Sequence, residues 1–345
     1  MKTVTLEQPF QFALSDTPAP GRPGPGEALV RVHRVGICGT DLHGYRGRQP
    51  FFEYPRIIGH ELGVEVVELG PQSAGAPYLP LRPGDRCAVE PYMNCGQCIA
   101  CRRGRANCCA NLKVLGVHMD GGMREFILLP AHKLYRSDTL TLDQLALVET
   151  LGIGAHAVAR AAPEPGEWSL VIGAGPIGLS VLQFVQLAGA RTIVLDVSAA
   201  RLRFCCEHFI VDAALDGKGD VPAQLRDITG GDLPTTVFDA TGNQQSMQAA
   251  FDYTAPAGRL VLVGLFQGDV SFNDPHFHRR ELTLYATRNA TPAEFKRILK
   301  LMEHGLIDTT PWITHRATFD TLIEAFPAWL DPDAGVVKAV VSAAA

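Results

Sequence analysis

The sequence predicts a two-domain α/β protein, in which a doubly wound parallel-sheet domain is inserted into a β-rich domain. Three observations support this prediction. The first part of the chain alternates apolar and polar residues, the middle part alternates continuous apolar runs with helical stretches, and the last part returns to a helix and a strand. The length agrees, because 345 residues at about 150 residues per domain correspond to two domains.

Residues 1–148 have the pattern of short antiparallel strands. Apolar and polar residues alternate over 27–35 (EALVRVHRV) and over 64–69 (VEVVEL). Glycine and proline cluster in turn-like segments at 21–26 (GRPGPG) and 81–85 (LRPGD). We therefore expect a β-rich domain in this part of the chain.

Residues 149–288 change to the pattern of a parallel sheet. Four continuous apolar runs predict strands buried on both faces, at 168–172, 192–196, 235–239 and 259–264. The first three runs lead into helical stretches at 177–188, 199–209 and 244–254. Strands that alternate with helices form βαβ units, which predicts a doubly wound domain. Residues 289–345 then contain a helix candidate (PAEFKRILKLMEHG) and a last strand (GVVKAVV), and we expect them to rejoin the first domain.

Composition and charge exclude several classes of protein. The chain is 46% hydrophobic and 19% charged, which excludes a disordered or collagen-like protein. Its formal net charge of −5, without a basic run, argues against nucleic acid as a partner. The N-terminus lacks the features of a signal peptide, and no window approaches roughly eighteen uninterrupted apolar residues. We expect a soluble, cytoplasmic protein.

A glycine-rich turn predicts a dinucleotide site. Gly173, Gly175 and Gly178 have G-x-G-x-x-G spacing between a strand and a helix. This spacing allows a tight turn, close approach of a pyrophosphate and close packing of helix and strand. Asp196 ends the next strand, where a carboxylate accepts from a ribose 2′-hydroxyl and repels a 2′-phosphate, so we favour NAD over NADP. The alternative is an ordinary glycine turn followed by a surface aspartate. The other cofactor-site candidates are Pro176, Ile177, Arg201, Thr241, Gly264 and Leu265.

Four of the nine cysteines form a compact metal-binding pattern, C-x2-C-x2-C followed by one more cysteine. The positions are Cys95, Cys98, Cys101 and either Cys108 or Cys109. Four thiolates on a short loop close a tetrahedral shell around zinc, which predicts a structural zinc lobe at about residues 90–112. An iron–sulfur cluster is the alternative, but the ferredoxin pattern continues x3-C-P, which is absent here. The remaining cysteines near strands and helices, Cys87, Cys205 and Cys206, are expected to be buried packing residues.

A second group of metal-ligand types is spread over two loops. Cys38 lies in GICGTDLHGYRG, and His60 and Glu61 lie in GHELG. Thiolate, imidazole and carboxylate groups together suit zinc. Each residue alone is better explained as a buried thiol, a core histidine or a surface acid. The cysteine lobe and the glycine turn favour a second metal site instead.

The whole chain resembles the zinc-containing medium-chain alcohol and polyol dehydrogenase family, through CGTDLH, GHELG, the cysteine lobe, GAGPIG and Asp196. It is most similar to the branch of sorbitol, L-threonine and L-galactonate or L-gulonate 5-dehydrogenases. The segments YRGRQPFFEYPRIIGHE, LKVLGVHMDGGMREF and TRNAT resemble the last group. The resemblance implies a GroES-like catalytic domain, a Rossmann NAD-binding domain and two zinc ions, one catalytic and one structural.

The resemblance also implies roles for single residues. Cys38 and His60 match catalytic zinc ligands, and Glu61 matches an acid that can bind zinc in the polyol branch. Glu149 falls at the third ligand position. The family usually has proline after this glutamate, whereas this chain has Thr150. The further matches are Asp41 as the carboxylate that orients the histidine, Thr40 and His43 as a proton relay, Cys109 as the fourth structural ligand, and Arg288 and Asn289 as substrate neighbours.

The implied activity is oxidation of a secondary alcohol to the ketone by hydride transfer to NAD. We favour an aldonate of the L-gulonate or L-galactonate type, because several basic side chains are candidates to meet a carboxylate: Arg46, Arg48, Arg56, His118 and Arg288. L-Threonine and sorbitol are alternative substrates. A zinc-free quinone or enoyl reductase and a non-enzymatic nucleotide sensor are alternatives that the ligand set disfavours. The family's dimers predict a homodimer or homotetramer, with a sheet edge at 281–286 (ELTLYA).

Overall fold

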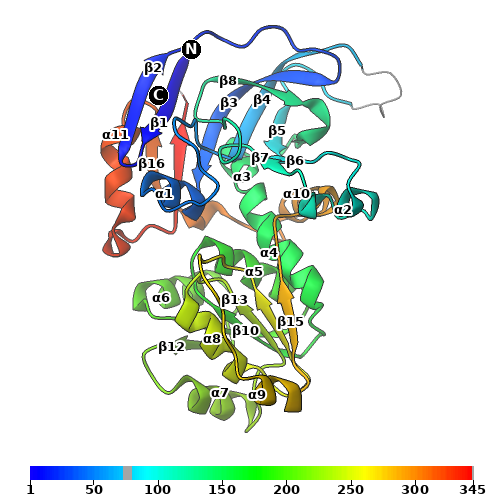
Figure 1. Ribbon diagram of the computed structural model, residues 1–345, viewed down its shortest axis with the longest axis vertical. Helices are drawn as coiled ribbons and strands as arrows, with labels where there is room; N and C mark the ends of the chain where they lie inside the picture. Colours follow the sequence, from blue (N-terminus) through cyan, green and yellow to red (C-terminus); the bar gives the residue numbers. More distant parts are fainter. Residues whose placement is uncertain (73–79, 344–345) are drawn as a thin grey trace. The chain divides into compact units, whose positions relative to one another are not determined.

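The computed structural model describes residues 1–72 and 80–343, which form two compact units. The first unit comprises Met1–Glu149 and Thr291–Ala345, and the second comprises Thr150–Ala290. In Figure 1 the blue, cyan and red elements belong to the first unit. The chain thus leaves the first unit once and returns to it. The first boundary lies one residue after the expected position, and the second lies two residues after it.

The first unit is built around a seven-stranded sheet of order β16-β17-β3-β4-β5-β9, with β8 also paired to β3. The strands are β3 (Glu27–Ile37), β4 (Glu61–Leu69), β5 (Arg86–Val89), β8 (Phe126–Pro130), β9 (Leu134–Arg136), β16 (Ile313–Thr318) and β17 (Lys338–Ser342). The alternating residues of β3 and β4 place Val30, Val32, Val64 and Val66 in the hydrophobic core, as the period of two requires. β3 and β4 are antiparallel neighbours, and Gly36 lies opposite Glu61. This pairing brings the end of β3 beside the start of β4.

Smaller elements surround this sheet. Two small antiparallel sheets of two strands each consist of β1 (Lys2–Gln8) with β2 (Gln11–Asp16), and β6 (Tyr92–Met93) with β7 (Lys113–Val114). The helices are α1 (Gly39–Tyr45), α2 (Ile99–Arg102), α3 (Leu142–Ala146), α10 (Pro292–Glu303) and α11 (Leu322–Ala325), and α4 (Val148–Ala161) begins in this unit and continues into the second. The C-terminal segment rejoins the sheet because β17 pairs antiparallel with β3.

The second unit contains a six-stranded parallel sheet of order β12-β11-β10-β13-β14-β15. The strands are β10 (Trp168–Ile172), β11 (Arg191–Asp196), β12 (Ala213–Asp216), β13 (Thr236–Asp239), β14 (Arg259–Leu262) and β15 (Thr283–Ala286). The helices are α5 (Pro176–Leu187), α6 (Ala199–His208), α7 (Val221–Thr229), α8 (Gln244–Tyr253) and α9 (Asp274–Arg279). The strand order reverses between β10 and β13, and ligands of doubly wound sheets bind at the carboxyl ends of the strands at such a point.

Two details differ from the sequence-based expectations. β12 was not among the predicted strands, because only Leu215 of its four residues is buried and its apolar pattern is weak. Cys206 is exposed, whereas Cys87 and Cys205 are buried as expected. Adjacent residues on α6 point in different directions, so Cys205 faces the core and Cys206 faces solvent.

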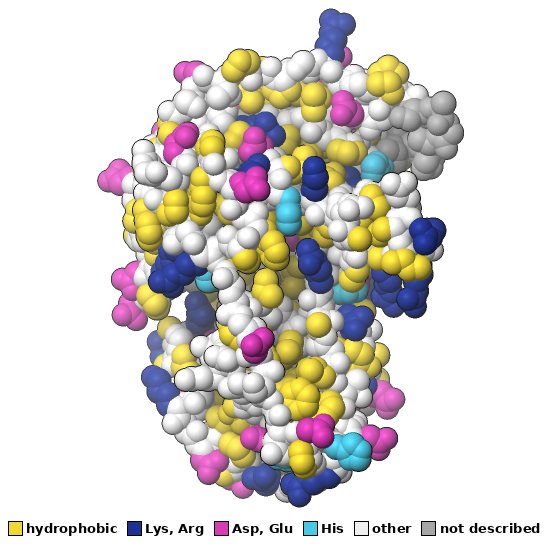
Figure 2. Space-filling model, viewed as in Figure 1, with side chains coloured by type: hydrophobic (Ala, Val, Ile, Leu, Met, Phe, Trp, Pro, Cys, Tyr) yellow, Lys and Arg dark blue, Asp and Glu magenta, His cyan; other side chains and the backbone are white. Residues whose placement is uncertain are grey.

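The surface agrees with the charge balance of the sequence. Figure 2 shows basic and acidic side chains scattered over the visible face. Among the described residues, no helix combines the length and apolar character needed to cross a membrane.

Candidate metal centres and cofactor site

The first candidate metal centre lies where β3 ends and β4 begins. Cys38 follows β3 and is the N-cap of α1, His60 immediately precedes β4, and Glu61 is the first residue of β4. The ligand atoms of these three residues lie within 4.8 Å of one another. His60 and Glu61 are buried, whereas Cys38 is half-buried, so the cluster is accessible from the side of the thiol.

Asp41 orients two members of this cluster. Its Oδ2 accepts a hydrogen bond from the Cys38 N–H at 2.9 Å, and its Oδ1 lies 3.8 Å from His60 Nδ1. Burial raises the pKa of Asp41, although the neighbouring His60 opposes this shift. Burial disfavours the charged imidazole, but Asp41, Cys38 and Glu149 together outweigh this effect, and the pKa of His60 lies well above its usual value. The Asp41 carboxylate therefore faces the Nδ1 side of the histidine, where an outer carboxylate lies beside a metal-bound imidazole, at a distance longer than a hydrogen bond.

Glu61 is held by a buried cation that no sequence motif predicted. Lys338 Nζ, on β17, donates to Glu61 Oε1 at 2.5 Å and to the Ile37 carbonyl at 3.1 Å, and both charged side chains are buried. The other oxygen, Glu61 Oε2, lies against the end of β3, where a Cβ on Gly36 would be only 2.1 Å away. Glycine at position 36 is therefore required for this placement of Glu61. A single lysine inside the apolar run GVVKAVV was the sequence signal for Lys338.

One unsatisfied atom of the cluster fits a metal ion. Among the residues that the structure describes, Asp41 Oδ1 and His60 Nδ1 are buried without a hydrogen-bond partner but face each other, whereas Glu61 Oε2 is a buried carboxylate oxygen without any partner. Buried polar atoms without partners are costly, and a divalent cation removes this cost at a carboxylate oxygen. The thiol, imidazole and carboxylate donors match the ligand types of zinc.

Glu149 lies near this cluster but outside the group within 4.8 Å. It belongs to the first turn of α4 and is buried, and its Oε1 accepts a hydrogen bond from the Tyr92 hydroxyl at 2.5 Å. Burial raises the pKa of Glu149, and the nearby His60 opposes this shift. The structure thus places Glu149 within electrostatic reach of His60, in contact with a tyrosine that the sequence analysis did not single out.

Thr40 and His43 both lie on α1. Thr40 is half-buried and His43 is exposed. Partial desolvation of the ring, together with the positive charges of Arg46 and Arg48, lowers the pKa of His43. An imidazole with these properties is neutral near pH 7 and able to accept a proton.

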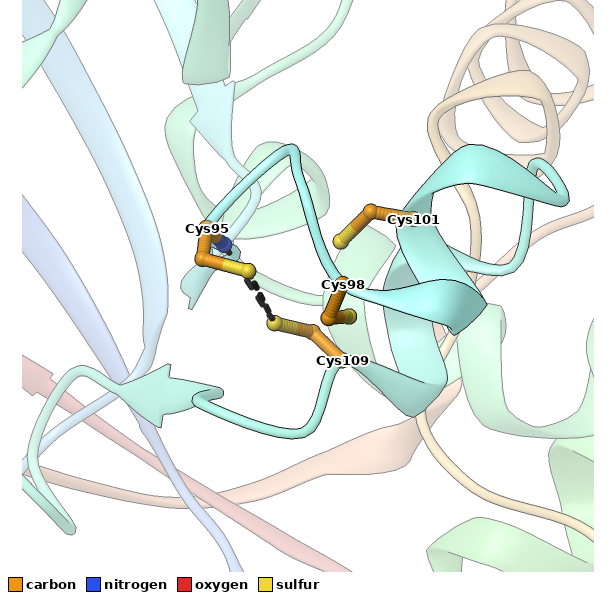
Figure 3. A group of neighbouring side chains, drawn as sticks. All are labelled: Cys95, Cys98, Cys101 and Cys109. Atoms are coloured by element: carbon orange, nitrogen blue, oxygen red, sulfur yellow. Dashed lines mark hydrogen bonds between the residues drawn. The ribbon is translucent and has the colours of Figure 1, made fainter.

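The second candidate metal centre is the tetracysteine lobe. The sulfur atoms of Cys95, Cys98, Cys101 and Cys109 lie within 4.8 Å of one another, and Figure 3 shows the four side chains converging. Cys108 is exposed and does not belong to the group. Backbone N–H groups point at the sulfur atoms, from Ala110 to Cys98 at 3.4 Å and from Cys95 to Cys109 at 3.3 Å. The backbone N–H groups of Cys101 and Ala110 lower the pKa of Cys98 to about 6, which favours the thiolate that zinc requires.

The glycine turn lies at the carboxyl end of β10. Gly173 has a φ of 92°, and Gly178 packs so closely that a Cβ there would lie 1.6 Å from the Gly173 carbonyl oxygen. Gly175 is the N-cap of α5 and contributes no side-chain cap, while Pro176 and Ile177 form its first turn. The N–H groups and the dipole of this helix end therefore face the turn, as a bound pyrophosphate requires.

Asp196 ends β11 and is buried beside this turn. Its Oδ2 accepts from the Ala174 N–H at 2.7 Å, and its Oδ1 accepts from the Ser198 N–H at 2.8 Å. The carboxylate thus ties the glycine turn to β11, and each oxygen keeps a further lone pair for a ribose hydroxyl.

The other predicted cofactor residues also border the carboxyl ends of the strands. The Arg201 guanidinium lies 3.7 Å from a Cβ placed on Gly175. Thr241 donates through its hydroxyl to Asp239 at 2.6 Å, and the Gly264 N–H donates to the Asp239 carbonyl at 2.9 Å. Leu265 follows directly and is 72% exposed. The turn after β13 and the turn after β14 therefore meet at the same sheet edge as the glycine turn.

The predicted substrate neighbours are divided between the two units. Arg288 and Asn289 follow β15 in the second unit, where Arg288 is exposed and Asn289 has a positive φ of 54°. His118 belongs to the first unit, where it stacks on Phe51 with ring centroids 5.6 Å apart. His118 and Phe51 line a pocket of about 330 Å³ together with Glu53, Arg56, Asn111, Leu112 and Lys113.

The chain is similar to known dehydrogenases over nearly its whole length. A model of the alcohol dehydrogenase GroES-like domain matches residues 24–139, and a model of zinc-binding dehydrogenases matches residues 176–304. L-Galactonate-5-dehydrogenase of Escherichia coli K12 is 40% identical over 99% of both chains. L-Threonine 3-dehydrogenase of Pyrococcus horikoshii is 32% identical over 88% of both chains. A structure from Escherichia coli CFT073, described as a short chain alcohol dehydrogenase complexed with cofactor NADH, has a TM-score of 0.90 at 29% identity over 99% of both chains.

These matches confirm the expected α/β fold class, with a GroES-like domain and a Rossmann domain. They also confirm the expected enzyme class and the cofactor types, zinc and a nicotinamide dinucleotide. The chain is an oxidoreductase that belongs to the zinc-binding alcohol dehydrogenase family.

Proposed function

We propose that this enzyme oxidises a secondary alcohol of a sugar acid, of the L-galactonate or L-gulonate type, to the ketone and uses NAD as the hydride acceptor. The observation that carries the proposal is the buried cluster of Cys38, His60 and Glu61, whose ligand atoms converge within 4.8 Å. The 40% identity to L-galactonate-5-dehydrogenase over nearly the whole chain supports this substrate class.

Cys38, His60 and Glu61 would hold the catalytic zinc, with Glu149 as an alternative third ligand. When bound, zinc acts as a Lewis acid that stabilises negative charge on the substrate oxygen, and the nicotinamide accepts the hydride. Asp41 holds the imidazole of His60 in one orientation from its Nδ1 side. The half-buried Cys38 marks the side from which the substrate approaches.

The hydroxyl proton of the substrate leaves through α1. Thr40 is half-buried two residues after Cys38, and His43 is exposed at the solvent end of this path. The lowered pKa of His43 keeps its imidazole neutral near pH 7, so it accepts the proton and releases it to water.

The glycine turn and Asp196 support NAD rather than NADP. The Asp196 carboxylate accepts two backbone N–H bonds and stays at the end of β11, where the adenosine ribose of a dinucleotide lies in this fold. A 2′-phosphate would meet this negative charge, whereas a 2′-hydroxyl donates a hydrogen bond to it.

The pocket at Phe51 supports a substrate with a carboxylate. Its lining includes the cationic side chain of Lys113, the imidazole of His118 and the guanidinium of Arg56, which is paired with Asp120 at 3.1 Å, against one acid, Glu53. Guanidinium and ammonium groups bind carboxylates by charge-assisted hydrogen bonds. L-Threonine also carries a carboxylate, so it is the second candidate substrate, supported by the 32% identity to an L-threonine 3-dehydrogenase.

NADH formation over a substrate panel tests the proposal. The panel contains L-galactonate, L-gulonate, L-threonine, sorbitol, xylitol and simple alcohols, each with NAD and with NADP. We expect the highest kcat/KM for an aldonate with NAD, and no turnover by the Cys38→Ser variant. Preference for a neutral polyol would contradict the carboxylate contact. If no substrate of the panel gave NADH although zinc and NAD were bound, the proposed substrate class would be contradicted.

We also propose that the enzyme is a homo-oligomer in which β15 contributes to the interface. β15 is an edge strand of the parallel sheet, and its Leu284 is 38% exposed. An exposed apolar edge strand is a template for pairing with another strand, and a second copy satisfies it symmetrically. Light scattering of the wild type and of Leu284→Arg tests this: a dimer that dissociates in the variant is expected, and a wild-type monomer would contradict it.

A further inference from the structure

A buried ion pair lies directly beside the tetracysteine lobe and belongs to neither metal centre. Lys133, in the 3-10 turn Ala131–Lys133, is 3% exposed and donates from Nζ to Glu90 Oε1. Glu90 is 2% exposed, and its Oε2 accepts from the Tyr135 hydroxyl at 2.7 Å. Buried charges of this kind are retained only where several polar groups satisfy them.

The same ammonium group reaches one residue of the lobe. Lys133 Nζ donates a second hydrogen bond to Asn94 Oδ1 at 3.0 Å. Asn94 directly follows β6 and directly precedes Cys95. Its other end, Nδ2, donates to Cys101 Sγ at 3.8 Å. Asn94 therefore links a buried cation to one sulfur atom of the tetracysteine cluster.

The chemistry of the two partners decides how the Asn94 amide is oriented. An ammonium group can only donate hydrogen bonds, so it selects the carbonyl oxygen of the amide. The amide nitrogen is then directed to the opposite side, where Cys101 Sγ lies. A thiolate accepts such a bond, and a donor to a thiolate stabilises its negative charge.

The geometry points to Lys133 and Asn94 as positioning residues of the structural metal site. We propose that Lys133, anchored by Glu90 and Tyr135, fixes the Asn94 amide so that it donates to the Cys101 thiolate and thereby strengthens metal binding by the lobe. Backbone N–H groups donate to the sulfur atoms of Cys95, Cys98 and Cys109, and Asn94 provides a side-chain donor for the fourth, Cys101.

Two substitutions of Asn94 test the donor. Asn94→Leu removes the donor and adds no charge, and Asn94→Asp keeps the acceptor for Lys133 but faces the thiolates with a negative charge. Loss of an outer-shell partner typically weakens metal binding about 10- to 100-fold. We expect the lobe metal to dissociate to a chelator about tenfold faster in Asn94→Leu and faster still in Asn94→Asp. Wild-type release rates in both variants would overturn the proposal.

A double substitution tests the role of the cation. Lys133→Met alone leaves Glu90 buried without its partner, so the combination Glu90→Gln with Lys133→Met removes both charges and preserves folding. With Asn94 intact, this variant should still release the lobe metal faster, because the amide is no longer oriented. Release at the wild-type rate would show that Lys133 does not position Asn94. Lys296→Met, an exposed lysine on α10, is the matched control and should not change the rate.

A spectroscopic readout separates positioning from general stability. With cobalt in place of zinc, the absorption bands of the cobalt–thiolate bonds report the electron density on the sulfur atoms. We expect these bands to shift in both Asn94 variants and in the double variant, but not in Lys296→Met. Lowered melting temperatures with unshifted bands would assign these residues a purely structural role and overturn the proposal.

Discussion

The two metal centres of the first unit differ in what surrounds their ligand atoms. In the tetracysteine lobe, backbone N–H groups supply most of the hydrogen bonds to sulfur, and four like ligands converge on one point. In the Cys38 cluster, three different ligand types are held by buried side chains: Asp41, Lys338 and, near Glu149, Tyr92. A closed shell of backbone-supported thiolates suits a permanent structural role. A mixed shell held by charged neighbours suits a centre that binds a substrate.

Removal of a ligand should show the difference in function between the two metal centres most strongly. His60→Ala should lower kcat/KM roughly a thousandfold or more, because several kcal/mol of charge stabilisation in the transition state are lost. The lobe should keep its metal, since none of its ligands is touched. Steady-state kinetics and metal analysis check this. Cys206→Ser, at an exposed cysteine outside both clusters, should behave as the wild type.

Lys338→Met tests whether a buried cation stabilises the Cys38 cluster. Removing one partner of a buried ion pair typically costs 3–5 kcal/mol, so we expect about this loss of stability in metal-free protein. Zinc should recover part of the loss, because the metal then neutralises the unpaired Glu61 carboxylate. Calorimetry with and without zinc measures the difference. An equal loss of stability with and without zinc would show that Lys338 and the metal do not both neutralise the Glu61 carboxylate.

Gly36→Ala tests the space that Glu61 occupies. The new methyl group would lie 2.1 Å from Glu61 Oε2, so the carboxylate must move. We expect a loss of about 1–3 kcal/mol from overpacking and about tenfold weaker zinc binding at this cluster. Gly39→Ala is the matched control, since a Cβ there meets nothing within 4 Å. Equal zinc affinities of the two variants would show that Gly36 has no part in placing Glu61.

Asp196→Ser should have the smallest effect, because it leaves both metal centres intact. We expect about tenfold weaker NAD binding, equivalent to about 1.4 kcal/mol, and weaker discrimination against NADP. Dissociation constants for both dinucleotides measure this. An unchanged ratio of the NAD and NADP dissociation constants would show that Asp196 does not contact the ribose.

The sequence predicted those parts of the sites that depend on neighbouring residues in the chain. The glycine turn, the cysteine lobe and the Cys38 and GHELG segments are local patterns, and the structure brings each of them together. Lys338 and Tyr92 could not be found this way. Lys338 is 277 residues from Glu61 in the chain, and only the return of β17 to β3 makes them neighbours. Tyr92 lies in a two-residue strand without a recognisable period.

The substrate side was the least predictable for a related reason. Lys113 and His118 come from one segment of the first unit and Arg56 comes from another, and only folding places them around one pocket. Basic residues on a surface are common, so their presence in the sequence does not distinguish a carboxylate site from ordinary solvent-exposed charges.

A side-by-side measurement of zinc content and turnover in Cys38→Ser and Cys98→Ser tests the assignment of the two centres most directly. We expect two zinc ions per wild-type chain and one in each variant, corresponding to the two ligand groups. Cys38→Ser should have no turnover and nearly normal thermal stability, whereas Cys98→Ser should lose thermal stability but retain turnover at low temperature. Full turnover in Cys38→Ser would contradict the account.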